Sequence, residues 1–321
     1  MPRRAVVRRI PPITMKVFDR LILSTLPLVP TPVMRRLSAR YIAGERLDQA
    51  VAKLHELAAA GYPGILDVLG EDVANETAAR EACELYREAG RQVNAGALDT
   101  YLSVKPTHFG LRLSEELCFE LYAQLADDAA QHGQFVRVEM EDHSTTDSTL
   151  RLFARLCERF DNVGIVLQSR LFRTLADIDA LPAGPRDVRL VKGIYLEPAE
   201  IAHTTPAEIS NAFLSCAKRL FEGGHRIAFG THDDVLAADL LRIAAETGAL
   251  PAGSVSAPER FYFEVLLGVR EPLWRQWVEQ GHLVRAYVPF GPEWRAYSQR
   301  RLKRNPELLG HVMRNFLHMG R

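Results

Sequence analysis

From residue 44 onward, short apolar runs alternate with longer stretches in which apolar residues recur every three or four positions. The stretch GERLDQAVAKLHELAAAG (44–61) has this helical spacing, and GILDVLGED (64–72) follows as an apolar run closed by polar residues. The next stretch, ETAAREACELYREAG, is helical again, and we expect its helix to stop at Gly90. A strand followed by a helix, repeated, is typical of a chain that builds a parallel sheet.

The same alternation continues to residue 291 and indicates about eight strand and helix units, as a (βα)8 barrel requires. The strand candidates look apolar throughout, which is typical of parallel strands covered on both faces. An open doubly wound sheet is the alternative, but it favours a GxGxxG turn, which the sequence lacks. The later strand candidates are ALDTYLSVKP, QFVRVEMED, NVGIVLQS, DVRLVKGIY, HRIAFGTHD, RFYFEVLLG and HLVRAYVPFG.

Composition narrows the class of protein. The 321 residues include 40 basic and 40 acidic side chains, so no general attraction to nucleic acid is expected. The four cysteines are far apart and the ten histidines form no H-E-x-x-H motif, so we predict no metal site. Scattered thiols also favour a reducing, cytoplasmic location.

The first 44 residues form a separate segment. They are basic, with no acidic residue before Asp19, and their apolar stretch is too short and too rich in proline to span a bilayer. An organelle transit segment is one interpretation; we favour an arm with helices that packs on the domain or touches anionic lipid. The predicted organisation is an arm over 1–44 and a catalytic barrel domain over 45–321.

Charged and hydroxyl side chains gather where the predicted strands end. Barrels of this kind build their catalytic sites at the carboxyl ends of the strands. Such charges are costly inside an empty barrel, so we expect a ligand or internal ion pairs to satisfy them. These side chains are Asp67, Glu71, Lys105, Glu139, Glu141, Asp142, Gln168, Arg189, Lys192, Tyr195, Thr231, His232, Asp233 and Tyr287.

An arginine pair follows the last predicted strand, in the sequence YSQRRLKRN. On a helix, Tyr297, Arg300 and Arg301 project together. Two converging guanidinium groups suit a small carboxylate or phosphate. A solvated helix face is the alternative, but the position beside the charged strand ends favours a pocket.

These motifs, taken in order, resemble the bacterial monofunctional proline dehydrogenases over about residues 41–321. The resemblance implies FAD-dependent oxidation of L-proline to 1-pyrroline-5-carboxylate, the first step of proline catabolism to glutamate. It also implies hydride transfer from the ring carbon next to nitrogen to flavin N5, and electron transfer to a membrane quinone through transient contact at the inner membrane surface. The motifs are LDVLGE, SVKPTHFGL, VEMED, LQSRLFRT, RLVKGIY, GTHD, FYFEVLLGV, YVPFG and YSQRRL.

The resemblance also implies roles for individual residues. The expected catalytic residues are Arg189, which contacts the flavin near N5, together with Lys105 and Tyr287. In the substrate site, three cations surround the carboxylate, two tyrosines and a leucine line the ring, and an acid pairs with the first arginine. In that order these are Lys105, Arg300, Arg301, Tyr287, Tyr297, Leu266 and Glu71. The expected flavin contacts are Glu139, Gln168, Arg189, Lys192, Gly193, Ile194, Tyr195, Thr231 and His232.

Simpler structural interpretations stay open for several of these residues. Lys192 could pair with Glu139 or Glu141, His232 could cap the next helix, and the tyrosines could be ordinary packing at the barrel rim. We expect the two glutamates to orient their neighbours rather than to transfer protons. The sequence also departs from the family: Glu139 stands for Asp, Asp233 for Asn, Glu264 for Gln and Arg304 for Glu, and LQSRL replaces LQAYL.

Two other functions remain as hypotheses. One is a Schiff-base barrel of the aldolase type with Lys105 or Lys192 as the reactive amine, which requires a lowered lysine pKa. The other is a non-catalytic barrel that serves as a binding module. The density of charged groups at the strand ends argues against the second hypothesis.

Overall fold

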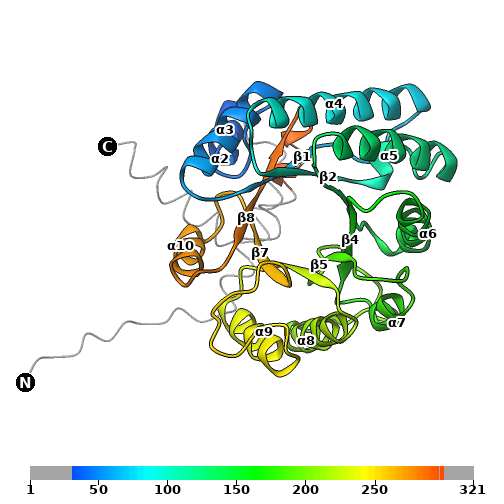
Figure 1. The fold of residues 1–321 in the computed structure, drawn as a ribbon. Coiled ribbons are helices and arrows are strands. Elements are labelled where there is room, and N and C mark those ends of the chain that lie inside the picture. Colours follow the sequence, from blue (N-terminus) through cyan, green and yellow to red (C-terminus); the bar gives the residue numbers. More distant parts are fainter. Residues whose placement is uncertain (1–30, 296, 300–321) are drawn as a thin grey trace, which may run out of the picture. The chain divides into compact units, whose positions relative to one another are not determined.

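The computed structural model describes residues 31–295 and 297–299 of the chain. Tyr41–Gly291 form one compact unit, and the other described residues belong to a second. In the first unit, eight parallel strands close into a barrel in chain order (Figure 1), so the predicted (βα)8 fold is confirmed and the open sheet is excluded. The strands are β1 (Gly64–Val68), β2 (Thr100–Val104), β3 (Val136–Val138), β4 (Val163–Gln168), β5 (Asp187–Val191), β6 (Arg226–Gly230), β7 (Phe261–Leu266) and β8 (Val284–Phe290).

Helices cover the outside of this barrel (Figure 1). Several begin where a polar side chain accepts a hydrogen bond from a backbone N–H of the first turn, as Asn75, Ser114 and Asp233 do. The helices are α3 (Leu47–Ala59), α4 (Glu76–Ala95), α5 (Glu115–Ala130), α6 (Thr146–Cys157), α7 (Thr174–Asp179), α8 (Pro206–Glu222), α9 (Asp234–Glu246) and α10 (Glu271–Glu279), with single 3-10 turns η2 (Pro106–Phe109) and η3 (His143–Thr145).

The second unit contains helix α2 (Thr31–Ser38) and a helical segment at 294, 295 and 297–299. The two are linked by a hydrogen bond from Arg295 Nη1 to Thr31 Oγ1, 2.6 Å long. The Arg35 guanidinium lies 5.7 Å from the centre of the Trp294 ring. Within the described residues, no helix is long and apolar enough to cross a membrane.

Helix α4 shows where the sequence prediction was wrong. The helix does not stop at Gly90 but continues to Ala95. At Gly90 a side chain would crowd the neighbours, because a Cβ atom would lie 3.2 Å from Gln134 Oε1 and 3.4 Å from Leu102 Cδ1. The glycine therefore provides space for close packing rather than a helix end. Helix α7, which has only six residues, was not predicted.

The strands are buried on both faces, as expected, but their two faces differ in chemistry. Outward side chains such as Phe229 and Phe263 pack against the helices. Inward side chains of β3, β5 and β7 are charged, and Arg137 of β3 reaches Tyr262 of β7 across the barrel. These strands thus alternate apolar and polar residues, contrary to the prediction of uniformly apolar strands, because ion pairs fill the barrel interior.

Candidate active site

Arg189 lies in the middle of β5 and points into the barrel, where its side chain is 5% exposed. Its Nε donates to the Glu264 carboxylate, Nη1 donates to Glu139 Oε1 at 2.5 Å, and Nη2 donates to the Tyr101 hydroxyl at 3.0 Å. Burial opposes the charge, but Glu139 and Glu264 raise the pKa of Arg189 well above its ordinary value. The guanidinium is therefore a fixed positive charge in a dry site.

Glu139, at the end of β3, links Arg189 to residues nearer the carboxyl ends of the strands. Its Oε1 accepts from Ser103 Oγ at 2.5 Å and from the Tyr287 hydroxyl at 3.2 Å. Burial favours the neutral acid, yet Arg189, Ser103 and Lys105 lower the pKa of Glu139 below its ordinary value. The carboxylate is thus ionised and contacts both a cation and a tyrosine.

Lys105 follows β2 and pairs with Asp67 of β1, with Nζ 3.0 Å from Oδ1. The Asp67 side chain is fully buried and also accepts a hydrogen bond from the Tyr86 hydroxyl at 3.3 Å. Burial disfavours the ammonium group, but the carboxylates of Asp67 and Glu139 raise the pKa of Lys105 above its ordinary value. A charged ammonium group therefore lies between the carboxylates of Asp67 and Glu139, and its binding of a substrate carboxylate stays a prediction.

A second layer of charged residues lies on the amino-terminal side of this group. It was not identified from the sequence. The fully buried Arg137 donates to Asp187 Oδ1 at 2.7 Å and to the Tyr262 hydroxyl at 3.0 Å. Its Nη2 lies 3.8 Å from Glu264 Oε1, and Glu264 also accepts from the Tyr101 hydroxyl. This layer could have been found from pairs of charged residues two positions apart in one strand, because such residues share a face.

The predicted flavin contacts lie on neighbouring strand ends. Gly193 has φ 92°, and a Cβ there would lie 2.8 Å from Arg170 Cδ, so only glycine fits. Gln168 Nε2 donates to the Glu141 carbonyl at 2.7 Å. Thr231 Oγ1 accepts from the Asp233 backbone N–H at 3.1 Å. The Gln168 bond ties the end of β4 to the end of β3, and the strand pairing places β5 and β6 next to them.

Two of the structural alternatives were wrong. Lys192 Nζ pairs with Asp233 Oδ2 at 2.8 Å, not with Glu139 or Glu141. His232 does not cap α9, because Asp233 does so; instead the His232 Nε2 accepts from the Leu266 backbone N–H at 2.9 Å. This contact ties the end of β6 to the end of β7.

The remaining predicted residues differ in how far the structure describes them. Ile194 is 61% exposed, and the backbone oxygen of Tyr195 accepts from Arg170. Glu71 follows β1 and is partly exposed, and the half-buried Tyr297 belongs to the second unit. Arg300 and Arg301 lie outside the described residues, so their convergence on a carboxylate stays a prediction.

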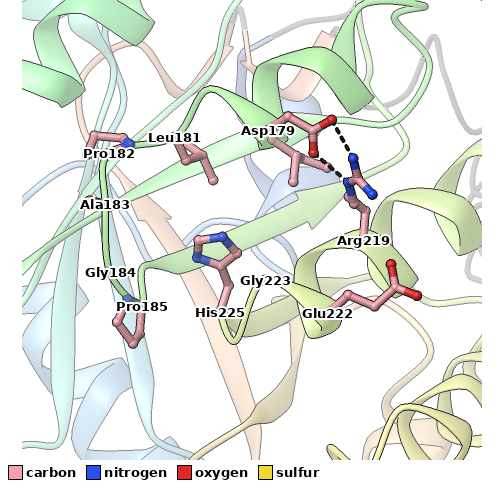
Figure 2. Close-up of a pocket in the computed structure, with 11 residues that line it drawn as sticks. Asp179, Leu181, Pro182, Ala183, Gly184, Pro185, Arg219, Glu222, Gly223 and His225 are labelled. Atoms are coloured by element: carbon pink, nitrogen blue, oxygen red, sulfur yellow. Dashed lines mark hydrogen bonds and ion pairs between the residues drawn. The ribbon is translucent and has the colours of Figure 1, made fainter.

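Two hollows elsewhere contain none of the predicted site residues. One, about 480 Å³, lies at the amino-terminal mouth of the barrel and is lined by Arg226, Tyr262 and Arg285 among others. The other, about 420 Å³, lies beside α7 and α8 and is drawn in Figure 2, where Asp179 and Arg219 face each other. Among the residues that line it, Arg219 binds Asp179, and His225 Nδ1 accepts from the Arg186 backbone N–H at 3.1 Å.

The fold and the site together define a class. A parallel (βα)8 barrel with ion-paired, ionisable side chains converging near the carboxyl ends of its strands has the architecture of barrel enzymes. A family model described as proline dehydrogenase matches residues 50–314. The chain therefore belongs to the proline dehydrogenase family.

Individual relatives agree with this assignment. The chain is 31% identical over 283 residues to proline dehydrogenase 1 of Bacillus subtilis subsp. natto, covering 88% of this chain and 91% of the relative. It is 30% identical over 289 residues to proline dehydrogenase of Deinococcus radiodurans, with the same coverage. Proline utilization A from Bdellovibrio bacteriovorus, solved after inactivation by N-propargylglycine, has a TM-score of 0.80, 23% identity, and coverage of 91% of this chain and 38% of that one. At this identity the last comparison speaks for the fold alone.

Proposed function

We propose that the protein is an FAD-dependent proline dehydrogenase that oxidises L-proline to 1-pyrroline-5-carboxylate. The observation that carries the proposal is a largely buried group inside the barrel of a proline dehydrogenase family member: Glu139 bonds to Arg189 and Tyr287, and Lys105 pairs with Asp67 close enough for Glu139 to raise its pKa. It offers cations for a carboxylate and for a cofactor in one dry space, where electrostatic interactions are strong.

The described residues fit a flavin. A guanidinium has five N–H donors, and the three bonds of Arg189 to Glu264, Glu139 and Tyr101 leave two of them for a ligand. Gly193 lets a ligand approach the backbone closely where the chain has a positive φ. Lys192 supplies a partly exposed ammonium group of the kind that binds a pyrophosphate. Gln168, Thr231 and His232 complete the proposed set.

When bound, FAD supplies at N5 the acceptor for the hydride that leaves the proline ring carbon next to nitrogen. The protein's own side chains bind and orient the substrate. Lys105 attracts the proline carboxylate, together with Arg300 and Arg301, and Tyr287 packs on the ring. Glu139 keeps Tyr287 and Arg189 in place. No protein nucleophile is required, because orientation and electrostatics are the protein's contribution.

The Schiff-base alternative is disfavoured by the same contacts. A reactive lysine must be unprotonated, but Lys105 is paired with Asp67 and its pKa is raised. Lys192 is paired with Asp233. A binding module without catalysis would not explain so many ionised groups in the barrel interior. We propose a membrane quinone as electron acceptor and a cytoplasmic location with transient contact at the inner membrane, on the family resemblance alone.

The visible absorption spectrum of the purified protein, recorded before and after anaerobic addition of L-proline, tests the proposal. Flavin bands that bleach with L-proline are expected. Bands that survive L-proline would show another substrate, and a protein that cannot be loaded with flavin would show another chemistry.

A pair of lysine variants adds a control. Lys105→Met is expected to raise the KM for L-proline by at least about tenfold, because a charge-assisted contact to the carboxylate is lost. Lys53→Met removes a lysine that pairs with Glu56 on the outside of α3, and it should leave KM unchanged. Equal KM values in the two variants would contradict the assignment of Lys105.

A further inference from the structure

Glu264 and Tyr101 lie beneath Arg189, on its amino-terminal side in the barrel, and the proposed reaction does not use them directly. The two side chains bond to each other, and both bond to Arg189. The Glu264 side chain is 3% exposed and also lies 3.8 Å from Arg137 Nη2. Its charge is therefore balanced by two buried guanidinium groups rather than by water.

The two carboxylate oxygens of Glu264 have separate tasks. Oε1 accepts from the Tyr101 hydroxyl, and Oε2 accepts from Arg189 Nε. Both partners are donors in these contacts, so the position presents two acceptors side by side. A carboxylate provides two, whereas an amide provides one acceptor and one donor. In this chain the contacts therefore use both oxygens of a carboxylate, at a position where the resembled family commonly has Gln.

We infer that Glu264 is a positioning residue that, together with Tyr101, fixes the plane of the Arg189 guanidinium for its contact with the cofactor. A guanidinium is planar, so contacts at Nε and Nη2 hold one of its edges while Glu139 holds Nη1. The role of Arg189 in the reaction comes from the proposed function, and this inference rests on it. The contacts that hold Arg189 do not depend on the proposed function.

The balance of buried charge is a second reason for a carboxylate at position 264. Arg137 and Arg189 are both fully buried or nearly so, and Glu264 contacts both. With a neutral residue at position 264, the two guanidinium groups would face each other without a shared counter-charge. Like charges repel strongly where water is excluded. Arg189, which is closer to the carboxyl ends of the strands, would then be held by Glu139 and Tyr101 alone.

The test compares Glu264→Gln with Asp187→Asn. Asp187 is a matched control because it is another interior carboxylate, two residues before Arg189 on β5, and it binds Arg137 and Arg226 but not Arg189. In flavin-free protein labelled with 15N-arginine, the Arg189 Nε–H signal, assigned with Arg189→Lys, should exchange slowly in the wild type and in Asp187→Asn. In Glu264→Gln it should exchange at least about tenfold faster, because the charged acceptor is replaced by a single neutral amide oxygen for which Tyr101 also competes.

The kinetic arm uses the flavin-loaded enzyme. Glu264→Gln should lower kcat for L-proline by about 10- to 100-fold, as loss of a residue that orients a reactive group does. The KM should change by less than about twofold, since Glu264 is one layer away from Lys105. Asp187→Asn should keep both values, and Tyr101→Phe should lower kcat by several fold.

The outcomes separate this inference from the proposed function. Slow Nε–H exchange and full kcat in Glu264→Gln would overturn the positioning role while proline oxidation stands. Fast exchange in Glu264→Gln together with no reduction by L-proline in the wild type would support the contact and overturn its assignment to this reaction. If Glu264→Gln does not fold, Tyr101→Phe decides, and a wild-type kcat in that variant would overturn the inference.

Discussion

The two faces of the barrel strands have opposite chemistry. On the outer face, Phe229 of β6 is fully buried and packs against Phe213 and Phe221 of α8. On the inner face, Arg189 of the neighbouring strand is surrounded by carboxylates and hydroxyls. Apolar burial stabilises a fold, whereas buried ion pairs contribute little net stability after desolvation. We infer that apolar packing on the outer face stabilises the fold, whereas the charged inner face serves the reaction.

Phe229→Ala should give the largest loss of stability. Removing a fully buried ring from the outer layer is expected to lower the free energy of unfolding by about 3–5 kcal/mol. The kcat of the folded fraction should stay at the wild-type value. Denaturant titration and kinetics at low temperature measure the two effects. Phe172→Ala is the matched control, because this ring is 51% exposed, and a similar loss of stability in the control would break the comparison.

Arg189→Met should have the opposite effect: a large loss of catalysis rather than of stability. Its kcat for L-proline is expected to fall by about 10²- to 10³-fold, because a preorganised charge at the reacting group is lost. Arg285→Met removes another interior arginine, one that pairs with Asp99 at the amino-terminal mouth, and it should keep kcat. Stopped-flow measurement of flavin reduction decides the matter, with circular dichroism to confirm folding. Equal kcat values in Arg189→Met and Arg285→Met would contradict the proposal that the charged residues near the carboxyl ends of the strands serve catalysis.

His108 should make stability depend on pH. Burial, with a smaller contribution from Lys105, lowers the pKa of His108 to about 4. The unfolded chain binds the proton near pH 6.5, so the unfolded state is favoured as the pH falls from about 6.5 to 4. The loss should reach at most about 3 kcal/mol, at about 1.4 kcal/mol for each tenfold change in proton affinity.

The contribution of His108 is measured by comparing unfolding of the wild type and His108→Gln across this pH range. The variant should lose less stability on acidification than the wild type. His132→Gln replaces an exposed histidine and should follow the wild-type curve. Parallel curves for all three proteins would show that His108 binds its proton equally well in the folded and unfolded states.

The smallest effect is expected on the outer surface. Asp179 and Arg219 form a two-point ion pair beside the hollow in Figure 2, with Oδ2 and Nη2 2.7 Å apart. Both groups are solvated, so Asp179→Asn should change the thermal unfolding midpoint only slightly, and not at all at high salt. A large change that persists in salt would show that this hollow contributes to folding in another way.

Sequence reasoning reached the fold because each unit repeats the same local signals. The apolar spacing of α5 and the polar side chain of Ser114 at its start are sufficient to place that helix. Gly90 failed as a helix end because local propensity does not report the packing of Gln134 and Leu102. Helix α7 was missed because six residues are too few for a helical period.

The sequence by itself determined the barrel, the family and the strand ends that carry Lys105 and Glu139, since these follow from local pattern and ordered motifs. Only the tertiary structure decided which charges meet. Lys192 binds Asp233 rather than the two glutamates, and Arg189 binds Glu264, 75 residues away. Closure of the barrel brings distant strands face to face, and the cost of burying charge then requires each ionised group to find its partner across the interior.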